Sequence, residues 1–196
     1  MPLELHRSLC AVAKEHGLAV HLDGARIFNA AICEGVEARF FAQDVDSLMF
    51  CLSKGLSCPL GSVVVGSRSF IEKADWARKR IGGGMRQAGV IAAAGIVALE
   101  SMIDRLEDDH RHARVLAEGL LEIPGLDVDL ESVESNMVLV DHSGTDMAHE
   151  ALMERLSKAG VLVSSRPPHH VRFVTNRHHD SDTITEALIR VKAALS

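Results

Sequence analysis

Residues 18–26, LAVHLDGAR, and residues 47–55, SLMFCLSKG, decide the fold of this chain. Each stretch begins with a short apolar run that is typical of a buried strand and ends on a charged residue followed by glycine. The two charged residues are Asp23 and Lys54, and 31 positions separate them, a natural strand–helix–strand distance. If the strands are parallel neighbours, both side chains reach the same edge of one sheet.

The segments around these stretches predict an α/β architecture followed by a smaller α+β part. In the first hundred residues we expect helices at 3–15 and 27–33, a strand at 62–65, a helix capped by Ser67 that runs to about residue 80, and a helix at 87–100. The helical pattern continues to residue 121. Beyond it we expect strands at 138–140, 161–163 and 171–174 and helices at 146–159 and 183–195. Thr145 is expected to cap the first of these helices, and Thr183 with Glu186 to form a capping box for the second. The domains are therefore expected at 1–100 and 101–196.

Composition excludes several classes of function. The hydrophobic content of 47% is enough for a core, and the formal charge of −6 argues against binding to nucleic acid or to an anionic membrane. No run of eighteen apolar residues and no signal pattern at the start is present in the sequence. The four cysteines form no CxxC pair and indicate a reducing compartment, so the cytoplasm is expected.

Asp23 and Lys54 each have an ordinary interpretation when taken alone. Asp23 could cap the following helix, bind a metal or hold a cationic ring nitrogen, and Lys54 could extend into solvent from a strand end. A lysine amine near apolar groups has a lowered pKa and a usable lone pair, as Schiff-base chemistry requires. A carboxylate and such a lysine at one site suit pyridoxal 5'-phosphate (PLP), whose ring nitrogen the carboxylate would keep protonated.

Five ordered blocks resemble the low-specificity L-threonine aldolase family, whose members are PLP enzymes of fold type I. They are HLDGAR at 21–26, CLSKGL at 51–56 with GSV at 61–63, GGGMRQAGV at 82–90, EDDH at 107–110 and VRFVT at 171–175. The resemblance covers almost the whole chain. It implies part of the large PLP-binding α/β domain, followed by a small α+β C-terminal domain.

The resemblance also implies roles for individual residues. Lys54 would carry the cofactor, and Asp23 would pair with its ring nitrogen. Arg26 and Arg172 would hold the substrate α-carboxylate through bidentate hydrogen bonds. Arg86 and Lys79 would contact the cofactor phosphate across a subunit interface, which implies a homo-oligomer, a dimer or a tetramer. Outside the resemblance, Arg86 could be a plain helix-start residue and Arg172 a strand residue paired with a local acid.

The implied reaction is retro-aldol cleavage of L-threonine or L-allo-threonine to glycine and an aldehyde. Two alternatives stay open, a fold-type-I lyase that performs β-elimination and a catalytically incomplete remnant. The family's loop that binds the phosphate within one subunit, its ring-stacking histidine and its proton-removing histidine have no counterpart in this sequence, so we expect a C-terminal portion of a longer enzyme that is inactive alone. The chain departs from the family pattern at Ser57–Cys58 and at residues 176–179.

Eleven histidines raise the possibility of a metal site. The pairs His110 with His112, His169 with His170, and His178 with His179 do not converge on one ion at their spacings, and no CxxC or HExxH motif accompanies them. We expect no metal and interpret these histidines as solvated loop residues.

Overall fold

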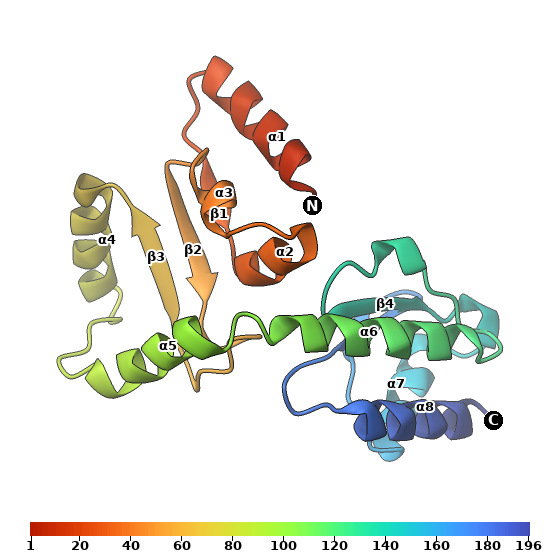
Figure 1. Cartoon of the computed structure of the whole chain (residues 1–196). Helices are drawn as coiled ribbons and strands as arrows, with labels where there is room; N and C mark the ends of the chain where they lie inside the picture. The colour runs from red at the N-terminus through yellow and green to blue at the C-terminus, as the bar shows by residue number, and fades with distance from the viewer. The chain divides into compact units, whose positions relative to one another are not determined.

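The computed structural model describes residues 1–196, which divide into two compact units, Met1–Leu106 and Glu107–Ser196 (Figure 1). The division falls at the first residue of a helix, and the domain assignment 1–100 and 101–196 stays a prediction. The helices contain no segment that combines the length and the apolar character needed to cross a membrane.

The first unit is a mixed α/β structure. Its elements are α1 (Leu3–Glu15), β1 (His21–Asp23), α2 (Ile27–Glu34), α3 (Arg39–Ala42), β2 (Ser47–Cys51), β3 (Ser62–Gly66), α4 (Arg68–Arg80) and α5 (Gly89–Ser101). The strand order is β1-β2-β3; β1 and β2 are parallel, and β3 is antiparallel to β2. The parallel pairing of the two deciding stretches is therefore confirmed, with Asp23 opposite Met49.

Two small apolar clusters hold the first unit together. One cluster lies under α1, α2 and β2 and contains Leu3, Ile27, Phe41 and Leu48. The other joins the segment after β2 to α5 and contains Leu52, Leu56, Cys58, Ala98 and Leu106. The second cluster matters for function because it fixes the backbone on either side of Lys54.

The second unit is an antiparallel sheet covered by helices. It contains α6 (Leu106–Leu121), β4 (Met137–Asp141), α7 (His149–Lys158), β5 (Ser164–Arg166), β6 (His170–Val174) and α8 (Ser181–Leu195), with 3₁₀ turns at Leu130–Ser132 and Ser143–Thr145. The strand order is β4-β6-β5. Its core takes side chains from α6, α7, α8 and one face of the sheet, among them Leu120, Val140, Leu156 and Phe173.

Several local predictions were wrong for identifiable reasons. Residues 161–163 form no strand, because the Val161 amide donates to Leu156 O and so completes the end of α7. The helical pattern from 87 to 121 is broken between α5 and α6, and the short helix α3 was not predicted.

The two predicted caps in the second unit were also wrong. Helix α7 begins at His149, and Thr145 instead accepts a hydrogen bond from the Met147 amide. Thr183 lies inside α8, whose true cap is Asp180. By contrast, Ser67 caps α4 as predicted, through the Phe70 amide.

Candidate active site

Asp23 occupies a tight turn at the C-terminal end of β1. The Gly24 amide donates both to Leu22 O and to Met49 O of β2, each at 2.9 Å, and the Ile27 amide donates to Gly24 O. A Cβ on Gly24 would lie 2.8 Å from Met49 O, so only glycine lets the turn approach β2 this closely. The turn therefore fixes Asp23 against its neighbouring strand.

The two oxygens of the Asp23 carboxylate have different roles. Oδ1 accepts a hydrogen bond from the Ala25 amide at 3.1 Å, while Oδ2 accepts none, and the residue is exposed. Asp23 thus orders its own turn with one oxygen and presents the other at the edge of the sheet, where α/β folds place ligand-contacting groups.

Lys54 lies in a closed loop directly after β2. The Leu52 amide donates to Gly61 O, the Cys58 amide donates to Leu52 O, and the Ser57 amide donates to Lys54 O at 2.8 Å. Leu52, Leu56 and Cys58 of this loop are buried against α5. The loop is therefore held on both sides of Lys54 by backbone hydrogen bonds and by packing.

Asn29 and Gly55 support the lysine loop in a way that the sequence did not suggest. A Cβ on Gly55 would lie 2.7 Å from Leu106 Cδ2 and 3.3 Å from Asn29 Oδ1, and Asn29 is 4% exposed. Asn29 from α2 thus packs directly under the residue after Lys54. The sequence carries no signal for this contact, because the burial of Asn29 depends on how α2 packs against the loop.

The Lys54 side chain itself is exposed. This exposure matches the interpretation of Lys54 as a lysine that extends into solvent from a strand end, because the buried residues of the loop, Leu52 and Leu56, pack in the cluster with α5 instead. The structure supports a shared location for the two residues. Lys54 follows β2 and Asp23 ends β1, so both lie at the same end of two parallel strands.

The other positively charged residues of the first unit that are expected to bind substrate or cofactor differ in their surroundings. Arg26 is partly buried at the start of α2, three residues after Asp23. Lys79 lies in the last turn of α4, where its ammonium contacts Asp75 at 3.0 Å. Arg86 lies in the exposed segment 81–88 between α4 and α5, not in a helix. Of the two predicted phosphate contacts, Arg86 is the one without an acidic partner.

Arg172 lies on β6, the central strand of the second unit's sheet. Its neighbours Val171 and Phe173 point into the core, so Arg172 projects from the opposite face beside Leu139 of β4 and Ser164 of β5. Its Nε is buried and has no hydrogen-bond partner. A buried guanidinium nitrogen without an acceptor suits an incoming carboxylate, since an unsatisfied donor is costly.

The histidines are more structured than expected. His110 and His112 belong to α6, and His112 is only 8% exposed, so the prediction of solvated loop residues was wrong for this pair. His179 is partly buried, and burial lowers its pKa. Elsewhere, buried His142 contacts His149 at 3.0 Å between Nε2 and Nδ1, and burial lowers the pKa of His142 as well.

Ser57 explains one departure from the family pattern. Its φ is +62°, in the left-handed region that favours glycine, and its hydroxyl donates to Gly55 O at 3.2 Å. A glycine at this position would adopt the same backbone conformation with less strain than Ser57.

The fold defines the class of protein first. The chain superposes on Leishmania major threonine aldolase with a TM-score of 0.77 at 17% identity, over 100% of this chain and 57% of that one. It superposes on Sphingomonas wittichii serine palmitoyltransferase with a TM-score of 0.73 at 24% identity, over 96% of this chain and 50% of that one. These likenesses confirm the predicted fold-type-I architecture.

Sequence comparison then gives the family. The family model described as Beta-eliminating lyase matches residues 1–143, and the chain belongs to this family. The chain is 43% identical over 184 residues to low-specificity L-threonine aldolase 1 of Arabidopsis thaliana, covering 93% of this chain and 51% of the relative. It is 40% identical over 196 residues to the low specificity L-threonine aldolase of Escherichia coli, covering 100% and 57%. The chain spans about half the length of these relatives, and the resemblance stated from the five blocks is confirmed.

Proposed function

We propose that the protein formed by this chain and the remaining part of its family's fold cleaves L-threonine and L-allo-threonine to glycine and acetaldehyde, with PLP as cofactor. The observation that carries the proposal is the parallel pairing of β1 and β2, which brings Asp23 and the Lys54 loop to one end of the sheet. Both residues lie in blocks that resemble the low-specificity threonine aldolase family, and the chain is 43% and 40% identical to two relatives of that name.

The residues fit the cofactor by their chemistry. When bound, PLP supplies an electron-withdrawing ring that accepts the electron pair released from the Cα–Cβ bond of the amino acid. Lys54 Nζ would hold the cofactor covalently. Asp23 Oδ2, which accepts no hydrogen bond in the chain, would hold the proton on the ring nitrogen. Arg86, and less directly Lys79, would contact the phosphate, since the Lys79 ammonium must first leave Asp75.

Two arginines would orient the substrate. Arg172 would bind the α-carboxylate with the guanidinium edge whose Nε is buried and unsatisfied, and Arg26 would bind it from the turn after Asp23. A carboxylate held by the two hydrogen bonds of a guanidinium has a fixed rotation about the bond to Cα, which decides which bond is cleaved. The base that takes the β-hydroxyl proton is not assigned to a residue of this chain.

We also propose that the enzyme is a homo-oligomer, a dimer or a tetramer, of the cytoplasm. The oligomer is supported by the segment 81–88, in which every residue including Arg86 is exposed in the single chain. The compartment is supported by four free cysteines, none of which is paired.

The test of activity joins residues 1–196 to the part of the Escherichia coli relative that this chain does not match, and measures acetaldehyde and glycine formed from L-threonine with added PLP. We expect cleavage that Lys54→Ala reduces to background and that Lys73→Ala, a change at an exposed lysine of α4, leaves intact. Equal activity in wild type and Lys54→Ala, or a chimera that folds and binds PLP but forms no glycine, would contradict the proposal.

The family match favours one second candidate, β-elimination. The two reactions differ in products, because elimination from a β-hydroxy amino acid such as L-serine gives pyruvate and ammonia and retro-aldol cleavage gives glycine and an aldehyde. Assaying the same chimera with L-serine and with aromatic amino acids for pyruvate separates them. Pyruvate without glycine would select β-elimination.

A further inference from the structure

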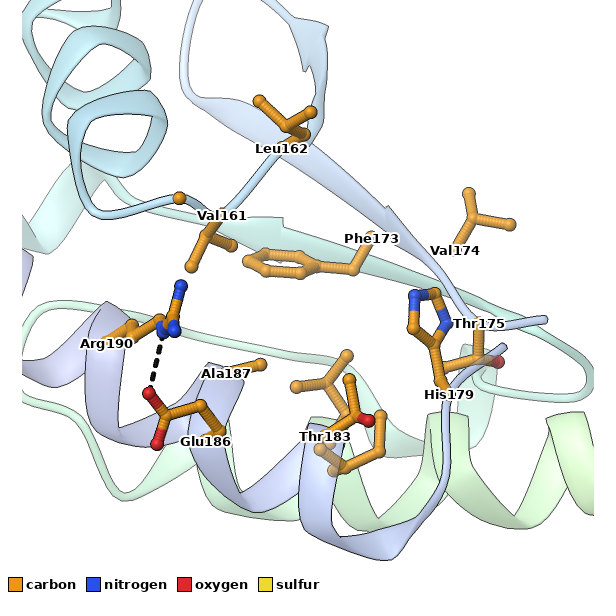
Figure 2. Close-up of a pocket in the computed structure, with 13 residues that line it drawn as sticks. Val161, Leu162, Phe173, Val174, Thr175, His179, Thr183, Glu186, Ala187 and Arg190 are labelled. Atoms are coloured by element: carbon orange, nitrogen blue, oxygen red, sulfur yellow. Dashed lines mark hydrogen bonds and ion pairs between the residues drawn. The ribbon is translucent and has the colours of Figure 1, made fainter. Parts of the chain in front are cut away.

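A cavity of about 280 Å³ lies in the second unit, between the end of β6, the first turns of α8 and the loop that follows α7 (Figure 2). Its apolar wall is formed by Leu116, Val161, Phe173 and Ile184. Small-molecule sites in proteins begin at about 300 Å³ and are lined mainly by apolar side chains with a few polar groups. The cavity is therefore of a size that suits a ligand no larger than an amino acid.

A charged pair from α8 stands at one end of this cavity. Arg190 Nε donates to Glu186 Oε1 at 2.8 Å, and Figure 2 shows the pair beside Val161 and Phe173. The side chains are 47% and 54% exposed, and such exposed pairs contribute little to stability. Arg190 Nη2 and Glu186 Oε2 make no hydrogen bond, so one cationic donor and one anionic acceptor remain available side by side.

The loop after α7 leaves room for the Arg190 guanidinium because it contains Gly160. Gly160 has a φ of +77°, and a Cβ at this position would lie 2.7 Å from Arg190 Nη1. Arg190 Nη1 also donates to Ala159 O at 3.4 Å. Glycine thus provides both the backbone conformation that ends α7 and the room in which Arg190 lies over the cavity.

We propose that this cavity binds a free α-amino acid with an apolar side chain of about the size of leucine. Its carboxylate contacts Arg190, its ammonium contacts Glu186, and its side chain packs on Phe173 and Ile184. The adjacent opposite charges match a zwitterion, and the apolar wall matches the side chain. The inference goes beyond the proposed function, because no residue of this cavity is among those proposed to bind PLP or the substrate of the cleavage reaction.

Titration calorimetry of the chain with three related compounds tests this recognition. L-Leucine carries both charges, 4-methylpentanoate lacks the ammonium, and 3-methylbutylamine lacks the carboxylate. We expect L-leucine to bind at least about tenfold more tightly than either analogue, since each loses one charge-assisted contact. Absence of leucine binding to the folded chain at millimolar concentration, or equal binding of 4-methylpentanoate, would overturn the proposal.

Two variants and one control locate the site. Ala187→Leu places extra volume in the cavity lining and should abolish leucine binding, and Glu186→Gln should weaken it about tenfold. Glu118→Gln is the matched control, because Glu118 is also 54% exposed and pairs with Arg114 at 2.8 Å on α6 without lining the cavity. Circular dichroism verifies that each variant is folded. Leucine binding that survives in both folded cavity variants, or that falls equally in the control, would contradict the assignment.

Discussion

Replacing Gly24 by alanine should disturb the active-site edge of the sheet without removing any of its functional side chains. The new Cβ would lie 2.8 Å from Met49 O and 3.3 Å from Ile27 Cβ, so the turn must move by about 0.6 Å to reach the 3.4 Å of ordinary contact. The obstructing atom is a backbone carbonyl of β2 that already accepts the Gly24 amide, and it cannot rotate away as a side chain would.

The expected cost follows from two opposing effects. Overpacking of this kind costs about 1–3 kcal/mol, while alanine restricts the unfolded chain and recovers about 0.4–1 kcal/mol. We therefore expect Gly24→Ala to lower the free energy of unfolding by about 1–2 kcal/mol and to weaken PLP binding, because Asp23 moves with the turn.

Urea denaturation followed by circular dichroism and by fluorescence of Trp76, which lies in the first unit, measures the effect of Gly24→Ala. The control is Gly89→Ala, since a Cβ at Gly89 meets no atom within 4 Å. If Gly24→Ala and Gly89→Ala unfold with equal free energies, the close approach between the turn and β2 does not constrain the site, and the reasoning fails.

Three further predictions concern the framework of the two units. Leu156→Ala, at a side chain 1% exposed, should cost about 2–5 kcal/mol in urea denaturation, whereas Leu162→Ala, at 85% exposed, should be nearly neutral; equal costs would contradict the assigned core. Ser67→Ala should lower the free energy of unfolding by about 1 kcal/mol through loss of the α4 cap, and Ser67→Asp should retain the cap. An unchanged free energy of unfolding in Ser67→Ala would show that the hydrogen bond from the Phe70 amide does not stabilise the fold. Burial lowers the pKa of His142, so the unfolded state takes up the proton at a higher pH than the folded state, and the free energy of unfolding should fall as the pH drops below the ordinary histidine pKa of about 6.5. In urea titrations from about pH 7.5 to 5, His142→Asn should make this fall less steep, and an unchanged slope would show that His142 is not its source.

The parts of the fold that were predicted correctly have strong local signals. The strands ending at Asp23 and before Lys54 are short apolar runs followed by glycine turns, and Ser67 directly precedes a helical pattern, where a serine is a strongly preferred cap. The spacing of the two strands is compatible with parallel neighbours, and the structure shows that pairing. Asp23 and Lys54 then lie at the same end of the sheet, as expected for parallel strands.

The parts that failed depend on tertiary contacts. Residues 161–163 are a short run of apolar residues typical of a strand, but the Val161 amide stays bonded to the end of α7. Nothing local distinguishes Thr183 from Asp180 as the start of α8, although Asp180 accepts the Thr183 amide. The exposure of Lys54 and the support from Asn29 depend on which neighbours the loop packs against, and such contacts have no signature in a single sequence.

Chemical trapping shows directly whether Lys54 is the residue that carries PLP. The chain is incubated with PLP, reduced with borohydride so that the covalent link becomes permanent, digested, and examined by peptide mass spectrometry. We expect a phosphopyridoxyl group on Lys54, formed at substoichiometric PLP and lost in Lys54→Ala but not in Lys73→Ala. Labelling spread evenly over the exposed lysines, or labelling that persists at the same level in Lys54→Ala, would contradict it.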